Sequence, residues 1–161
     1  GLCASILEAI CACETKYFVV MDADFQHPPE VVSDLISCFA DAHDLVVGCR
    51  LPDTSGQPLN RRLVSRLATL LARIVLHYRG QSISDPLSGF FGGETRSIRF
   101  IAEQDYSRFE LRGYKVLFDL LKIGGDALHV EQLYYEFAPR PLGTSKLRLR
   151  HGLYFFRSLL T

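Results

Sequence analysis

A short apolar strand followed at once by two carboxylates is the feature that most constrains this chain. Residues 16–21 are predicted to form a buried strand, and Asp22 and Asp24 come directly after it. Alternate side chains of a strand lie on the same side, so both carboxylates leave the sheet edge in one direction, with Gln26 next in register. Two carboxylates and an amide oxygen suit a hard divalent cation that keeps open positions for phosphate oxygens.

The residues that follow predict a helix and place the site. Pro29 can begin a helix because its missing N–H would have no partner there. The site is therefore expected at the C-terminal end of a strand, where open α/β sheets bind ligands. An Asp-x-Asp pair alone is weak evidence, since carboxylates at such a turn are commonly solvated or cap the helix. The buried strand before the pair and the Gln-x-Pro-Pro-Glu sequence after it favour a metal and phosphate site.

Composition and the distribution of charge limit the class of protein. The 161 residues are 48% hydrophobic, which is enough for one globular core. Basic and acidic residues number 18 each, so the net charge names no partner, and no nucleic-acid partner is expected. Residues 1–49 carry eight acids and a single base, whereas residues 60–80 carry five arginines and no acid. This pattern is expected where a metal-binding corner faces anion-binding elements.

The cysteines and the apolar runs indicate the setting of the chain. Five cysteines show no metal-finger spacing, so we expect reduced, packed thiols in a cytoplasmic environment. No run of apolar residues is long enough for a membrane span, and no signal peptide is visible. The chain opens on Gly1 within a predicted helix, which indicates a fragment.

Apolar periodicity predicts helices that alternate with strands, and hence a mainly parallel sheet. Helices are expected at residues 2–13, 30–40, 114–121 and 147–160, and strands at 16–21, 44–49 and 127–137, with a short aromatic strand within 84–93. A further helix, capped by Asn60, is expected to bury an apolar stripe formed by Leu63, Leu67, Leu70, Leu71 and Ile74.

Two other stretches carry candidate anion-binding residues, and a third carries an aspartate. Arg61 and Ser65 share a helix face beside a loop at residues 52–58, where the helix dipole attracts an anion. Arg140 and Lys146 flank a Gly-Thr-Ser turn in a cationic loop suited to closure over a diphosphate. Asp85 precedes a proline, where an aspartate is commonly only a turn former.

The last helix, at residues 147–160, is basic and amphipathic. Such a helix is typical of the membrane interface, and ordinary packing against the core is an equally open alternative.

Six motifs stand in order along nearly the whole chain: Val20-Met21-Asp22-Ala23-Asp24-Phe25-Gln26-His27-Pro28-Pro29-Glu30, Gly48-Cys49-Arg50, Arg61-Arg62-Leu63-Val64-Ser65-Arg66, Ser84-Asp85-Pro86-Leu87-Ser88-Gly89-Phe90-Phe91, Gly113-Tyr114-Lys115 and Arg140-Pro141-Leu142-Gly143-Thr144-Ser145-Lys146. Together they resemble the family 2 inverting glycosyltransferases, specifically the dolichol-phosphate mannose synthases and related polyprenyl-phosphate glycosyltransferases. Two positions depart from that pattern: Cys49 stands where the family usually has serine, and Asp119 stands near a usual glutamate.

The resemblance implies an α/β fold of the GT-A, Rossmann-like type with a mixed, mainly parallel sheet. It also implies that the fold is incomplete at the N-terminus, because nothing here matches the family's first strand and its Val-Pro-x-Tyr-Asn-Glu-like motif. Residues 1–146 would then be a partial catalytic domain and residues 147–161 an amphipathic helix. The chain alone is expected to be inactive.

The same resemblance implies roles for the candidate residues near the donor. Asp24 and Gln26 would hold Mg²⁺ or Mn²⁺, and Asp22 would face the ribose or the outer shell of the metal. Arg140 and Lys146 would clamp the diphosphate of the nucleotide sugar.

On the acceptor side, the resemblance implies that Arg50, Arg61 and Ser65 receive the lipid phosphate. Asp85 would lie near the sugar, and with Asp24 and Arg50 it completes the catalytic set. His27, a turn histidine before Pro28, is interpreted as structural.

The implied reaction is metal-dependent, inverting transfer of a hexose to a polyprenyl or dolichyl phosphate at the cytoplasmic face of a membrane. Mannose from GDP-mannose is the expected donor. A lipid phosphate is already an anion and needs positioning rather than a general base, which paired arginine donors supply. Another donor such as UDP-glucose, and a non-catalytic nucleotide-binding module, remain alternatives.

Overall fold

The computed structural model describes residues 1–23, 26–51, 59–137 and 149–160, with the side chains of residues 59–62, 149–153 and 160 outside the description. The α-helices are α1 (Leu2–Ala12), α2 (Glu30–Ser37), α3 (Leu59–His77), α4 (Thr95–Gln104), α5 (Val116–Gly124) and α6 (Leu149–Leu160). The strands are β1 (Tyr17–Val20), β2 (Leu45–Arg50), β3 (Phe91–Glu94) and β4 (Val130–Tyr135). Short 3₁₀ helices follow α2, α4 and α5 at Cys38–Asp41, Tyr106–Arg108 and Gly125–Ala127.

The four strands form one mixed sheet in the order β1-β3-β2-β4. Strand β3 is antiparallel to both β1 and β2, and only β2 and β4 pair in parallel. The expectation of a mainly parallel sheet is therefore wrong. The crossover through α2 does leave β1 and β2 pointing the same way, but β3 is inserted between them in the opposite direction.

Glycines allow β3 to sit at the centre of this sheet. A Cβ added to Gly92 would lie 2.9 Å from the backbone oxygen of Phe18 and 2.6 Å from Leu35 Cδ2. A Cβ added to Gly93 would lie 2.7 Å from the Phe18 ring. Side chains of the neighbouring strand and of α2 occupy the space that β3 leaves empty, so glycine is needed at both positions.

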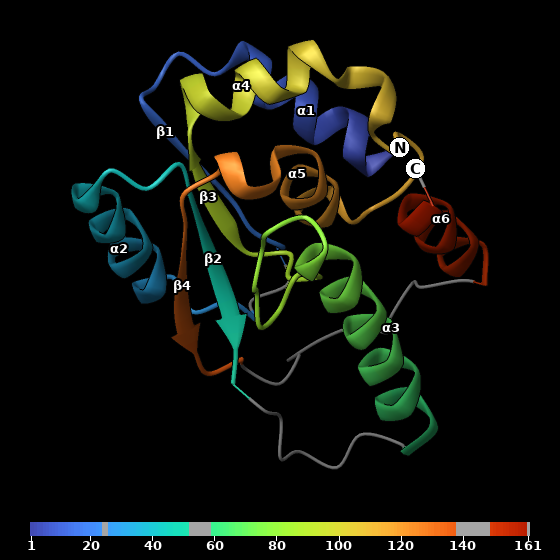
Figure 1. Cartoon of the computed structure of the whole chain (residues 1–161). Coiled ribbons are helices and arrows are strands. Elements are labelled where there is room, and N and C mark those ends of the chain that lie inside the picture. The colour runs from blue at the N-terminus through green and yellow to red at the C-terminus, as the bar shows by residue number, and fades with distance from the viewer. Residues whose placement is uncertain (24–25, 52–58, 138–148, 161) are drawn as a thin grey trace.

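Helices cover both faces of the sheet (Figure 1). Alternate residues of β2 point to opposite layers: Leu45 and Val47 pack with residues of α1, α4 and α5, whereas Val46 packs with Leu35 and Phe39 beside α2. This alternation is the two-residue period of a strand, and it produces a three-layer α/β arrangement.

Helix α3 departs most from the expected packing. Leu63, Leu67, Leu70 and Ile74 were expected to be buried, but they are 69%, 54%, 53% and 47% exposed, and this expectation is wrong. The helix instead packs through Ala72 and Leu76 in its C-terminal half, where it contacts α5 and α6. Helical spacing identifies an apolar face, but it does not say what covers that face. The expected cap, Asn60, lies inside the helix.

Helix α4 was not predicted from the sequence. It begins after Glu94, whose side chain accepts a hydrogen bond from the backbone N–H of Ser97 at 2.7 Å. All five cysteines are free. Among the described residues, no helix combines the length and the apolar character needed to cross a bilayer.

Candidate active site

A two-point ion pair between Arg50 and Asp85 lies at the C-terminal end of β2. Arg50 is the last residue of that strand, and Asp85 lies in the turn before β3. Arg50 Nε lies 2.6 Å from Asp85 Oδ2, and Arg50 Nη2 lies 3.0 Å from Oδ1. The carboxylate is nearly buried, whereas 36% of the Arg50 side chain is exposed. Two of the five guanidinium N–H groups bind Asp85, which fixes the plane of the guanidinium.

The surroundings keep Arg50 charged. Burial disfavours the charged guanidinium, but the hydrogen bonds and the negative charge of Asp85 outweigh it, so the pKa of Arg50 is raised above its ordinary value. The guanidinium carbon also lies 5.4 Å from the centre of the Phe137 ring, a cation–π contact. Arg50 is thus a fixed cation at this edge of the sheet.

The turn that carries Asp85 is anchored to β4. The backbone N–H of Ser84 donates to Gln132 Oε1 at 2.7 Å, and Gln132 Nε2 donates to the Ser82 carbonyl at 3.2 Å. The hydroxyls of Ser84 and Tyr134 lie 2.7 Å apart. No role was predicted for Gln132 from the sequence. The alternation of faces in the strand predicted at residues 127–137 was the only pattern that could have indicated where its side chain lies.

Asp22 lies beside the same turn. It follows β1, and 63% of its side chain is exposed. A Cβ added to Gly89 would lie 2.9 Å from Asp22 Oδ2, so the absence of a side chain at Gly89 lets the turn pass beside this carboxylate. The structure therefore brings together Asp22, Arg50 and Asp85, three residues that the sequence analysis selected from separate motifs.

His27 packs beside Asp22 and the aromatic residues near Arg50. The imidazole is buried, its Nδ1 lies 2.7 Å from the Tyr135 hydroxyl, and its Nε2 lies 3.9 Å from Asp22 Oδ2. Its ring packs against the rings of Phe90, Tyr135 and Phe137 at centroid distances of 5.2–5.8 Å. This packing agrees with a structural role for His27. The sequence analysis did not identify Tyr135 as its partner.

The structure describes only some of the remaining candidate site residues. Asp24, Arg140 and Lys146 lie outside the described residues. Arg61 belongs to the first turn of α3, but its side chain is also outside the description, and Ser65 is exposed on the same helix.

The metal proposal rests on oxygen donors beyond the end of β1. Within the described parts of the chain, no group of three or more His, Cys, Asp or Glu side chains is placed to hold a metal ion. Asp24 lies outside these parts. The exposed Asp22 carboxylate and the half-buried Gln26 amide are oxygen donors of the kind that Mg²⁺ or Mn²⁺ takes, so the donor chemistry fits.

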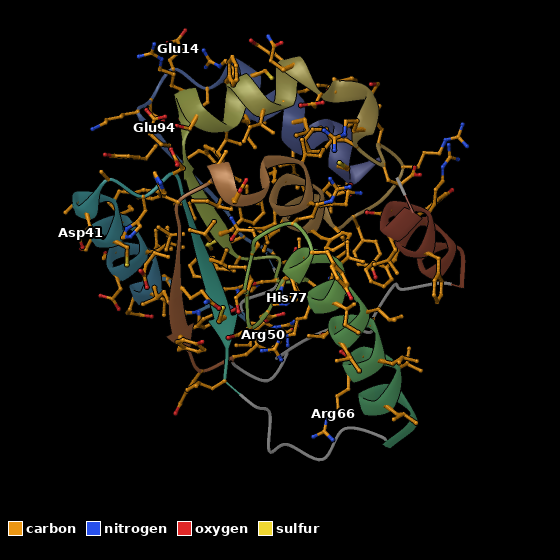
Figure 2. All side chains as sticks on the ribbon, in the orientation of Figure 1. Glu14, Asp41, Arg50, Arg66, His77 and Glu94 are labelled. Carbon is orange, nitrogen blue, oxygen red and sulfur yellow. The ribbon has the colours of Figure 1, made fainter. Side chains whose placement is uncertain are left out.

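A cavity of about 830 Å³ lies elsewhere, between the end of α1, the start of β1 and α4. Its lining includes Cys13, Glu94 and Arg99. Figure 2 shows Glu14 and Glu94 at one end of the sheet and Arg50 at the other. The candidate site lies at Arg50 because charged residues of three motifs, Asp22, Arg50 and Asp85, lie together there, whereas none of them lines the cavity.

Known proteins resemble the chain over most of its length. The family described as "Glycosyl transferase family 2" matches residues 1–107. The chain is 33% identical over 153 residues to the dolichol-phosphate mannosyltransferase of Pyrococcus furiosus, covering 92% of this chain and 41% of that protein. It is 31% identical to the protein of the same name from Saccharomyces cerevisiae, covering 91% and 55%. It is 29% identical to the undecaprenyl-phosphate mannosyltransferase of Micrococcus luteus, covering 80% and 52%. The chain spans about half the length of these relatives.

Proposed function

Because the chain belongs to glycosyl transferase family 2, we propose that it transfers a hexose from a nucleotide sugar to a polyprenyl or dolichyl phosphate, with a divalent cation and with inversion at the sugar carbon. The names of the relatives support mannose as the sugar, and GDP-mannose is the donor that we propose. Membership of this family implies a GT-A fold, and the mixed sheet with helices on both faces is compatible with it.

One observation carries the proposal. Arg50, held by the Asp85 carboxylate, lies near the exposed carboxylate of Asp22 at one edge of the sheet. Arg50 offers a fixed cation to an incoming phosphate, and Asp85 fixes its orientation. Asp22 lies beside Gly89 of the turn that carries Asp85, and we assign its carboxylate to the metal and nucleotide side of the site. An acceptor anion and a donor diphosphate would repel each other unless cations lie beside both, and this edge supplies one of those cations.

In the proposed reaction a phosphate oxygen of the lipid forms a bond to the anomeric carbon as the bond to the nucleotide diphosphate breaks. The acceptor is anionic near neutral pH, so no side chain has to remove a proton from it. Arg50 would hold the acceptor phosphate in line with the bond that breaks, which is catalysis by positioning. A bound Mg²⁺ or Mn²⁺ would stabilise the charge that grows on the leaving diphosphate. Asp24 and Gln26 are the residues that would hold it, with Asp22 facing the ribose or the outer shell of the metal.

Arg61, Ser65, Arg140 and Lys146 belong to the same proposal. Arg61 and Ser65 would add donors to the acceptor phosphate, and the other two would clamp the diphosphate. Their motifs support these roles.

Membrane contact is part of the proposal, because the acceptor carries a polyprenyl chain. The exposed apolar stripe of α3, together with five arginines and no acid in residues 60–80, suits a helix at the surface of an anionic bilayer. The last helix, α6, packs one face on α5: Phe155 and Ser158 are buried, and the Phe155 and Phe118 ring centres are 6.0 Å apart. The α3 surface is therefore the better supported membrane contact.

The proposal is tested by transfer assays with the full-length protein that contains this chain. We expect sugar to move from GDP-mannose to a polyprenyl phosphate only when Mg²⁺ or Mn²⁺ is present. Asp24→Ala should abolish transfer, and retained activity in this variant would refute the metal assignment. Parallel assays with UDP-glucose decide the donor, and loss of transfer with every sugar nucleotide would favour a non-catalytic binding module.

A further inference from the structure

Lys115 is a charged residue of this region that had no role assigned from its motif. It directly precedes α5, and its ammonium group donates a hydrogen bond to the backbone carbonyl of Leu87 at 2.5 Å. The two residues are 28 positions apart in the chain. Leu87 lies two residues after Asp85, so the bond connects the start of α5 to the turn that holds Arg50.

The ammonium group also lies within electrostatic reach of the candidate site. The pKa of Lys115 is lowered to about 8, first by burial and next by the positive charge of Arg50, while the carboxylates of Asp85 and Asp22 partly offset this effect. These groups come from β2, from the turn before β3 and from the end of β1. The ring of Tyr114, on the chain segment of Lys115 itself, lies 4.7 Å from its Nζ.

The turn is thus held from two sides. Gln132 on β4 binds its start through the backbone of Ser84, and Lys115 binds its end through Leu87. A hydrogen bond of 3.2 Å from Ser88 N–H to the Asp85 carbonyl closes the turn between these anchors. Asp85 can fix the plane of Arg50 only if the turn itself is fixed. Lys115 is the charged member of the two anchors, and one bond to a carbonyl uses one of its three N–H donors.

We propose that Lys115 is a positioning residue of the acceptor site: through Leu87 it fixes the Asp85 turn, which orients Arg50, and its positive charge near Arg50 favours an incoming phosphate. This inference rests on the proposed function for its kinetic consequence. Its structural consequence does not depend on that function: the protonation state of Lys115 should change the geometry of the Arg50–Asp85 pair.

The structural consequence is tested by NMR on the 161-residue chain. The ¹⁵Nε shift of Arg50, detected through ¹³Cζ, should titrate as the pH rises through about 8 in the wild type, and this titration should be absent in Lys115→Met. Lys115→Arg, which stays charged in this range, should also remove it. Lys16→Met, a change at the far end of the sheet, should leave it in place. An Arg50 shift that titrates equally in Lys115→Met would overturn the proposal, and this readout requires no enzymatic activity.

The kinetic consequence is tested with the full-length protein. Lys115→Met should raise the KM for polyprenyl phosphate by about tenfold or more, the scale of a lost hydrogen bond from a charged group, with a smaller effect on the KM for the nucleotide sugar. Wild-type activity should fall above about pH 8, and Lys115→Arg should move that decline to higher pH. An unchanged KM for the lipid with an unchanged pH profile would overturn the inference. If the wild type transfers no sugar while the Arg50 shift follows Lys115, the proposed function fails and the positioning role stands.

Discussion

Two ion pairs in this chain have the same spacing and nearly the same length but very different burial. Lys122 lies 3.2 Å from Asp119, three residues earlier, and the two side chains are 1% and 3% exposed. Arg108 lies 3.1 Å from Asp105, also three residues earlier, and both side chains are 38% exposed. This matched arrangement allows the contribution of burial to be measured within one protein.

Removing the cation should destabilise the fold much more at the buried pair than at the exposed pair. Lys122→Met leaves a buried carboxylate without its cation and also removes the hydrogen bond to the Ser158 carbonyl, which joins α5 to α6. Breaking a buried pair in this way costs about 3–5 kcal/mol. Arg108→Met breaks a solvated pair and should cost less than about 1 kcal/mol. For a chain of this size the first change corresponds to a fall in Tm of roughly 6–20 °C.

Urea unfolding of the 161-residue chain measures both variants. The double variant Asp119→Leu/Lys122→Met should recover more than half of the loss, because no unpaired charge remains buried. Recovery is incomplete because Ser158 Oγ also donates to Asp119 at 2.5 Å and loses that partner. Equal effects of Lys122→Met and Arg108→Met, or a double variant less stable than Lys122→Met, would refute the reasoning.

The Asp119 carboxyl should also make the free energy of unfolding depend on pH, in a direction that its pKa determines. Burial raises the pKa of Asp119 above its ordinary value, although Ser158 and Lys122 act in the other direction. The folded chain therefore binds this proton more tightly than the unfolded chain. The free energy of unfolding should fall as the pH rises from the ordinary aspartate pKa, about 3.9, to the raised value in the folded state. Asp119→Asn should remove this part of the pH dependence in urea titrations.

Three further predictions use features outside the charged site. A hydrogen bond with Thr15 lowers the pKa of Cys13, whereas burial raises that of Cys38, so iodoacetamide at pH 7 should modify Cys13 first. Peptide mapping by mass spectrometry checks this order, and faster reaction at Cys38 would contradict it. Gly48→Ala should destabilise the fold by about 1–3 kcal/mol in urea unfolding, because the new methyl group would overlap the Phe90 ring. Leu67→Glu should weaken sedimentation of the chain with phosphatidylserine vesicles about tenfold, and unchanged binding would exclude the α3 surface as the membrane contact.

Several helices and strands were predictable from the sequence, although α4 was not. Continuous apolar runs marked β1 and β2, and a helical period marked α1 and α2, because each pattern reflects a face buried within a few residues of chain. The insertion of β3 between β1 and β2 was not predictable in this way. It depends on Phe18 and Leu35 filling the space above Gly92 and Gly93, and no local pattern specifies such a contact between distant segments.

The candidate site likewise has residues that the sequence predicted and residues that only the fold reveals. Asp22, Arg50 and Asp85 were selected from motifs, and the structure brings these three together. The groups that hold them in place, Gln132 and Lys115, act through backbone atoms of a turn far away in the chain. A side chain that binds a distant carbonyl or N–H leaves no mark on its own neighbourhood in the sequence, so only the fold reveals it.

The central claim is that Arg50 receives the phosphate of a lipid acceptor. Its most direct test is the formation of radiolabelled, organic-soluble mannolipid from GDP-mannose and polyprenyl phosphate by the full-length protein. The account predicts product formation in the wild type and, in Arg50→Ala, a KM for the lipid raised at least about tenfold, the scale of lost hydrogen bonds from a charged group. Mannolipid formed by Arg50→Ala with an unchanged KM for the lipid would contradict it.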